Sequence, residues 1–155
     1  MLDIHPIRPD EIVSMLEIAH AASWVGVFND DYATRRGRSE HYRMRVASID
    51  GVVAGFCEGS FDSDFAGRGA PDDCLVPHAY GTFLAVHDHH RRAGIGRALL
   101  LSYAADAKAH GCSFLALSPD ESSNDAERLA FFQSLGLMLV DKRSRLWGAP
   151  IADLV

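Results

Sequence analysis

The chain has 155 residues, a hydrophobic share of 48% and a formal net charge of −6. This length and composition predict one globular domain, residues 1–155, and the acidic balance argues against a nucleic-acid partner. Apolar stretches are too short to span a bilayer, and the N-terminus lacks the features of a signal peptide. Cys57, Cys74 and Cys112 form no Cys-x-x-Cys pair. We therefore expect a cytoplasmic protein with no disulfide framework and no metal site.

Hydrophobic periodicity and turn signals divide the chain into strands and helices. In chain order they predict a strand (2–7), a helix from Pro9, an irregular or partly helical stretch (23–39), a hairpin (42–49 and 52–61), a mobile loop (62–73), a strand (80–86), a helix (95–110), a buried strand (113–118), a helix (124–137) and a terminal hairpin (138–140 and 144–147). Asp50-Gly51 favours a hairpin turn with positive φ angles. Gly111 is a typical residue for the end of the predicted helix 95–110. The order predicts a mixed α/β domain with helices on a central, mostly antiparallel sheet.

The most informative stretch is Arg91-Arg92-Ala93-Gly94-Ile95-Gly96-Arg97, between an apolar strand and an apolar helix. Two glycines one residue apart let the backbone turn sharply and approach a ligand closely. The first helical turn offers unpaired N–H groups at the positive end of the helix dipole, and three arginines add positive charge. The stretch therefore predicts a phosphate cradle. Leu99 replaces the third glycine of a dinucleotide fingerprint, and no Lys-Ser follows as in a nucleotide-triphosphate loop.

The pattern Arg91-x-x-Gly94-x-Gly96 after an apolar strand resembles the pyrophosphate-binding motif of the GNAT-type N-acetyltransferases, which bind acetyl-coenzyme A. The resemblance extends to residues 80–86 as the family's fourth strand and 113–118 as its fifth. It implies a GNAT-like fold in which these two strands splay apart around the cofactor. The cofactor-binding residues that it implies are Leu84, Ala85, Val86, Arg91, Arg92, Ala93, Gly94, Ile95, Gly96, Arg97 and Asn124. Asn124 is equally well explained as the N-cap of the last helix.

One position departs from the family pattern. GNAT enzymes often carry a tyrosine four residues before the glycine that ends the last helix, where it protonates the leaving thiolate. Here that position is Phe132, which has no proton to give. Either the thiolate leaves unassisted, or a donor such as Tyr103, Ser118 or Ser134 serves, or the protein binds cofactor without efficient catalysis. Tyr103 lies on the apolar face of its helix, which favours a core position.

The general base should project from the third or fourth strand into the acceptor cleft. Glu58 and Tyr80 are the candidates, and Thr82 could orient a water. His78 could also serve, because imidazole titrates near neutral pH. Each of these residues alone is more often structural. The run 87–90, His-Asp-His-His, could suggest zinc, but one turn cannot close a tetrahedral site, so a polar turn is expected.

The resemblance implies direct transfer of acetyl from acetyl-coenzyme A to a primary amine of a small molecule or a protein N-terminus. The alternative is a non-catalytic acyl-coenzyme A sensor or regulatory module. We expect the first helix and residues 23–39 to shape the acceptor pocket. The arginines at 35, 36 and 38 form a solvated face or line that pocket. Homodimers are common in the family, but no sequence feature specifies an interface.

Overall fold

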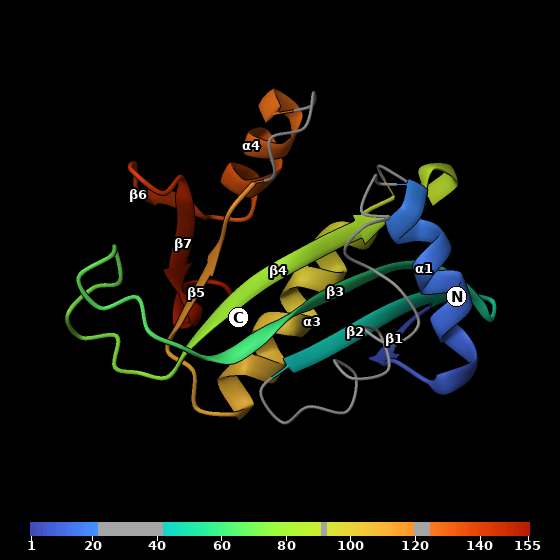
Figure 1. The fold of residues 1–155 in the computed structure, drawn as a ribbon, viewed down its shortest axis with the longest axis horizontal. Helices are drawn as coiled ribbons and strands as arrows, with labels where there is room; N and C mark the ends of the chain where they lie inside the picture. Colours follow the sequence, from blue (N-terminus) through green and yellow to red (C-terminus); the bar gives the residue numbers. More distant parts are fainter. Residues whose placement is uncertain (22–41, 91–92, 120–124) are drawn as a thin grey trace. The chain divides into compact units, whose positions relative to one another are not determined.

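The computed structural model describes residues 1–21, 42–90, 93–119 and 125–155. Its elements are β1 (Leu2–Pro6), η1 (Pro9–Glu11), α1 (Ile12–Ala21), β2 (Tyr42–Ile49), β3 (Val52–Ser63), β4 (His78–Val86), η2 (Asp88–His90), α3 (Ile95–Ala109), β5 (Phe114–Leu117), α4 (Asp125–Ser134), β6 (Met138–Asp141), β7 (Leu146–Pro150) and η3 (Ile151–Asp153). The strands form a seven-stranded sheet in the order β1-β2-β3-β4-β5-β7-β6 (Figure 1). β4 and β5 are parallel, whereas β1 pairs antiparallel with β2, and β7 with both β5 and β6. The predicted mixed α/β fold is confirmed.

The chain divides into two compact units. Unit 1 comprises Met1–Gly59 and Phe83–Tyr103, and unit 2 comprises Ser60–Thr82 and Ala104–Val155. The divide falls within β3, β4 and α3, so each of these elements contributes residues to both units. That residues 1–155 act together as one domain therefore stays a prediction. The predicted stretch 23–39 lies outside the described residues, among which no helix is long and apolar enough to cross a membrane.

In unit 1, α1 packs against the strands through one apolar face. A buried cluster joins α1 to β2, β3 and β4; its members are Met15, Leu16, Ile18, Ala19, Met44, Val46, Val53, Phe56 and Ala85. The members from α1 recur at helical spacing, which is the predicted pattern. The β2–β3 turn has φ of 51° at Asp50 and 83° at Gly51, so the predicted hairpin is confirmed. The chain enters α1 through a 3-10 turn, in which Glu11 N–H donates to the Arg8 carbonyl at 2.9 Å.

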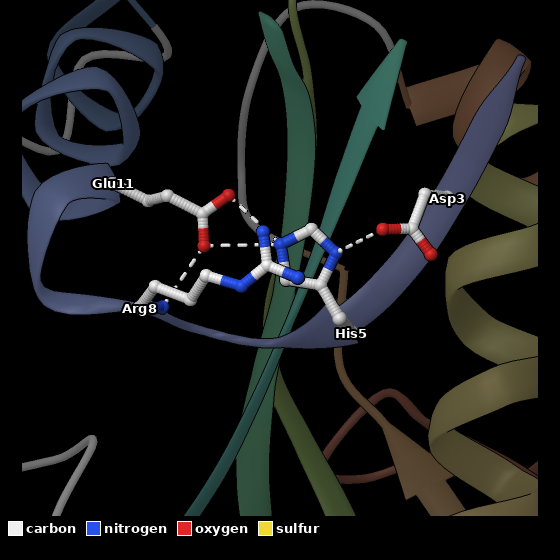
Figure 2. Close-up of polar contacts among 4 residues, drawn as sticks. All are labelled: Asp3, His5, Arg8 and Glu11. Carbon is white, nitrogen blue, oxygen red and sulfur yellow. Dashed lines mark hydrogen bonds and ion pairs between the residues drawn. The ribbon is translucent and has the colours of Figure 1, made fainter. Parts of the chain in front are cut away.

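A polar cluster of Asp3, His5 and Glu11 connects β1 to the start of α1 (Figure 2). The side chains of His5 and Glu11 are buried, with residue exposures of 8% and 9%. His5 Nε2 lies 2.8 Å from Glu11 Oε2, and its Nδ1 lies 3.0 Å from Asp3 Oδ2. Glu11 Oε1 also accepts the Arg8 backbone N–H at 2.9 Å. The cluster therefore fixes where α1 begins with respect to β1.

In unit 2, two glycines end helices as sequence reasoning expects. Gly136 has φ of 91°, its N–H donates to Gln133 O, and the next N–H, of Leu137, donates to Phe132 O at 3.1 Å. This bonding is a Schellman motif, and the side chains of Leu137 and Phe132 are both buried. Gly111, with φ of 89°, ends α3 in the same way. Both helix ends are therefore set by local sequence.

The loop predicted at 62–73 is more ordered than its composition indicates. β3 continues to Ser63, and Phe65 is buried at 5% exposure. The Phe65 carbonyl accepts the N–H groups of Arg68 and Ala70 at 2.9 and 3.2 Å, which closes a tight turn. The prediction of a mobile loop missed the buried Phe65, because one aromatic residue among polar neighbours produces no periodic signal.

The terminal hairpin also differs slightly from its prediction. Asp141 belongs to β6, and the second strand begins at Leu146 rather than at Ser144. Asp141 accepts the Arg143 N–H at 3.1 Å and the Ser144 hydroxyl at 2.7 Å. These two bonds hold residues 142–145 in a turn and thereby delay the start of the strand.

Candidate active site

The predicted acyl-arm residues form the end of β4 in unit 1. Ala85 is buried, and Leu84 and Val86 are half-buried. Gly55 of β3 lies directly against this backbone, because a Cβ added there would stand 2.7 Å from the Ala85 oxygen and 3.3 Å from Val86 Cα. Beyond β4, His87 N–H donates to Ala54 O at 2.7 Å. The position of the β4 end therefore depends on a residue without a side chain at position 55.

Sequence reasoning missed Gly55. A single glycine inside an apolar strand can signal a bulge or a close backbone approach, but many strands contain one without either. The deciding fact is the approach of Ala85, thirty positions further along the chain, and no local pattern contains it.

The residues after β4 form the expected polar turn. His90 N–H donates to His87 O at 2.8 Å, and His89 N–H donates to His87 Nδ1 at 3.2 Å. The rings of His87 and His89 stack with centroids 4.9 Å apart. Within the described part of the chain, no three histidine, cysteine or carboxylate side chains gather as metal ligands would.

The glycine turn then leads into α3. Gly94 has φ of 79°, in the left-handed region, and its carbonyl accepts the Ala98 N–H at 3.0 Å as the first helical bond. Gly94 is therefore the N-cap, and helix geometry directs the N–H groups of residues 94–97 outward. Ile95 is buried and anchors the helix, whereas Ala93, Gly94 and Arg97 are exposed and Gly96 is half-buried. This geometry gives an accessible, positively polarised helix end that carries the cationic side chain of Arg97.

Three of the predicted cofactor residues lie outside the described part of the chain: Arg91, Arg92 and Asn124. Their roles, like those of the other predicted cofactor residues, stay predictions. For the fifth strand, the register with β4 runs from Ala79↔Leu115 to Gly81↔Leu117, while β4 continues to Val86. The predicted acyl-arm residues, 84–86, therefore lie beyond the last residue pair between β4 and β5.

The two candidate bases have different surroundings. Glu58, in the part of β3 that belongs to unit 1, is fully buried. Burial raises the pKa of the neighbouring Cys57 thiol, and the charge of Glu58 adds to this effect. Tyr80, in unit 2, is half-buried, and its ring packs against Phe65 with centroids 5.8 Å apart. A general base must reach the amine proton directly or through one water, so the half-buried phenol is the more accessible candidate.

His78 is the first residue of β4 and is fully buried. Its Nδ1 accepts the Phe65 N–H at 2.8 Å, and its Nε2 donates to Cys74 O at 2.8 Å. Because both ring nitrogens hold backbone groups, His78 is a structural residue, and the suggestion that it is the base loses its support.

Phe132, at the family's tyrosine position, belongs to the core. It is 4% exposed, and its ring lies 6.1 Å from that of Trp147 and 6.2 Å from that of Phe131. Tyr103 is fully buried, as its helix face predicted. The Ser134 hydroxyl donates to Phe131 O at 2.6 Å, so its hydrogen is used within α4.

A family model described as the acetyltransferase (GNAT) family matches residues 11–137. The chain belongs to the GNAT family of acetyltransferases. GNAT enzymes use acetyl-coenzyme A, and the aminoglycoside N-acetyltransferase AAC(6′)-Iy has been solved with coenzyme A bound. No curated protein matches the chain.

Solved structures with this fold include acetyltransferases for different acceptors. AAC(6′)-Iy in complex with a bisubstrate analogue is 19% identical, with a TM-score of 0.75 over 92% of this chain and 94% of that one. Ard1 from Thermoplasma volcanium is 21% identical, with a TM-score of 0.73 over 96% and 97%. The ribosomal-protein-S18-alanine N-acetyltransferase from Escherichia coli is 21% identical, with a TM-score of 0.68 over 97% and 94%. At these identities the likeness shows the GNAT fold.

Proposed function

We propose that this GNAT protein transfers acetyl directly from acetyl-coenzyme A to the primary amine of a small molecule or a protein N-terminus. The observation that carries the proposal is the turn after β4. Gly94 caps α3 with φ of 79°, and the exposed Arg97 follows in the first helical turn. A pyrophosphate needs several N–H donors and positive charge at an accessible helix start, and these residues fit that need.

The cofactor supplies the activated acetyl group as a thioester when bound. The predicted cofactor residues each have a role in holding it. The N–H groups of residues 94–97 and the three arginines, Arg91, Arg92 and Arg97, bind the pyrophosphate. The backbone of residues 84–86 binds the acyl arm as an added strand would. The N–H of Val86 or of its immediate neighbour donates to the acyl oxygen. Asn124 either contacts the same arm or caps α4.

The reaction has two possible proton transfers, one from the attacking amine and one to the leaving thiolate. Tyr80 or Glu58 takes the proton of the attacking amine, directly or through a water. Phe132 offers no proton, so the thiolate leaves without an acid from this position. The thiol of coenzyme A is acidic enough for its thiolate to leave without this help. Holding the amine against a polarised carbonyl then supplies most of the acceleration.

Two acceptor classes are consistent with the fold. AAC(6′)-Iy was solved with an acetylneamine bisubstrate analogue, and the Escherichia coli enzyme acetylates an alanine of a ribosomal protein. The net charge of −6 favours cationic amines in general. We propose that residues 1–155 act in the cytoplasm as one acyltransferase domain, alone or as a homodimer.

Titration calorimetry with acetyl-coenzyme A tests the cofactor site through a matched pair of variants. Gly94 and Gly67 both have positive φ, 79° and 73°, and a Cβ at either meets no atom within 4 Å. Valine at either position costs about 1–2 kcal/mol of backbone strain. We expect Gly94→Val to lose acetyl-coenzyme A binding and Gly67→Val to keep it. Equal affinity of the two variants would refute the assignment of the turn.

The acceptor is tested by incubating the protein and acetyl-coenzyme A with aminoglycosides, polyamines and peptides that have a free N-terminal alanine. Mass spectrometry of the amines identifies which class gains an acetyl group. Binding of acetyl-coenzyme A without any acetylated product would favour the sensor over the enzyme.

A further inference from the structure

The ring of His78 bridges two points of the segment that precedes β4. It accepts the Phe65 N–H through Nδ1 and donates to the Cys74 carbonyl through Nε2, both at 2.8 Å. The two backbone groups are nine positions apart, so the ring closes residues 65–74 into a loop fastened to the start of β4. His78 is itself fully buried and its bond to Phe65 is buried, so water does not compete for that bond.

The two bonds fix the form of the ring. A nitrogen that accepts a backbone N–H carries a lone pair, and a nitrogen that faces a carbonyl carries a hydrogen. The geometry therefore assigns a neutral imidazole with its hydrogen on Nε2. An asparagine oxygen can replace Nδ1 as acceptor, and a glutamine amide can replace Nε2 as donor, so the two bonds can be tested separately.

The bond to Phe65 places an aromatic ring next to a candidate catalytic residue. The Phe65 ring stacks on His78 with centroids 6.1 Å apart and lies 5.8 Å from the Tyr80 ring. Phe114 closes the group edge-on, 6.3 Å from Phe65 and 5.6 Å from His78. The Arg68 guanidinium covers the Phe65 ring at 5.8 Å. Phe65 thus links the buried histidine to Tyr80 entirely within unit 2.

We propose that His78 is a positioning residue for Tyr80: by holding the Phe65 backbone, it sets the surface against which the Tyr80 ring packs. The proposal rests on the proposed function, because that function gives Tyr80 its part in proton transfer. Loss of the Phe65 bond is expected to release the Phe65 ring and with it the Tyr80 ring. The contacts of His78 and Phe65 given above include no predicted cofactor residue, so the affinity for acetyl-coenzyme A should stay unchanged.

The test compares His78→Gln with His78→Asn in the full chain. Gln keeps a donor toward Cys74 but places no acceptor at the Phe65 N–H, whereas Asn keeps that acceptor. NMR reports the exchange rate of the Phe65 amide and the ring signals of Tyr80, which are assigned among four tyrosines by comparison with Tyr80→Phe. In His78→Gln we expect amide exchange about tenfold faster, the effect of one lost hydrogen bond, and shifted Tyr80 signals. Asn should restore both.

Turnover supplies the second readout. In His78→Gln, kcat should fall while the KM for acetyl-coenzyme A stays unchanged, and His78→Asn should recover kcat. Equal behaviour of the two variants in exchange and in the Tyr80 signals would overturn the proposal, because His78 would then matter only by its volume. If the unsubstituted protein acetylates no amine, the proposed function fails, yet the NMR readouts still decide the role of His78.

A further variant covers the case in which His78→Gln does not fold. Phe65→Leu keeps the backbone N–H and removes the ring that contacts Tyr80. We expect the position 65 amide to keep its protection while the Tyr80 ring flips faster, a readout that the lost ring current of Phe65 does not change. An unchanged flip rate of Tyr80 in Phe65→Leu would overturn the proposal, because the Phe65 ring would not set the place of Tyr80.

Discussion

Replacing Gly55 with alanine should force β3 and the end of β4 apart. The added Cβ would stand 2.7 Å from the Ala85 oxygen, 3.2 Å from Leu99 Cδ1 and 3.3 Å from Val86 Cα. An ordinary contact begins at 3.4 Å, so the Cβ and the oxygen must separate by about 0.7 Å. The oxygen belongs to the backbone and cannot rotate away as a side chain would. Either β3 or β4 must therefore move.

The expected cost follows from two opposing effects. Overpacking costs about 1–3 kcal/mol, and alanine offsets about 0.4–1 kcal/mol by restricting the unfolded chain. The free energy of unfolding should therefore fall by at most about 2.6 kcal/mol, which lowers the Tm by up to about 10 °C at this chain length. A shift of about 0.7 Å between β3 and the residues proposed to bind the acyl arm should also reduce kcat/KM, by up to about the 100-fold that a misplacement of 1 Å costs.

Gly148→Ala is the matched control for this variant. Its Cβ would stand 2.6 Å from Phe114 Cζ and 2.8 Å from the Leu115 oxygen, a similar clash against β5 residues that are not among the predicted cofactor-binding residues. Thermal unfolding should show comparable losses for both variants, whereas calorimetry with acetyl-coenzyme A should separate them. If Gly55→Ala binds the cofactor as tightly as Gly148→Ala does, the proposed role of the β4 end is wrong.

Three further variants or treatments test other parts of the account. Phe132→Tyr places a hydroxyl in a packed core, so the free energy of unfolding, measured by urea denaturation, should fall by about 1–3 kcal/mol. We expect no rise in kcat. Faster turnover would show that the thiolate needs an acid. Burial raises the pKa of Cys112 to about 11 and also raises the pKa of Cys74, but Cys112 is buried whereas Cys74 is half-buried. Iodoacetamide at pH 8 should therefore label Cys74 first. Mass spectrometry that finds Cys112 labelled first would contradict its burial. Glu11→Ala leaves His5 without its buried carboxylate and should cost about 3 kcal/mol of unfolding free energy, whereas a loss under about 1 kcal/mol would match an exposed pair.

Features that depend on neighbours in sequence were predictable. Asp50-Gly51 makes its turn, and Gly111 ends its helix, because positive φ is a property of a few consecutive residues. The apolar face of α1 follows from helical spacing for the same reason. The glycine turn was found in this way too: the cap at Gly94 and the start of α3 lie within its own motif.

Features that depend on distant partners were not predictable. Phe65 and His78 form their hydrogen bond across thirteen positions, and the polar stretch between them contains no sign of it. Glu58 lies in a strand whose residues 53–61 are all buried, so alternation along β3 could not tell which face its side chain takes. The buried pair of His5 and Glu11 likewise needs β1 and α1 in place before the two side chains meet.

The most direct test of the central claim is the release of coenzyme A thiol from acetyl-coenzyme A, measured with and without each amine of the acceptor panel. We predict release that requires both the protein and a particular class of primary amine, together with an acetylated form of that amine. Absence of amine-dependent release across aminoglycosides, polyamines and N-terminal alanine peptides, from a protein that does bind acetyl-coenzyme A, would contradict the proposed acetyl transfer.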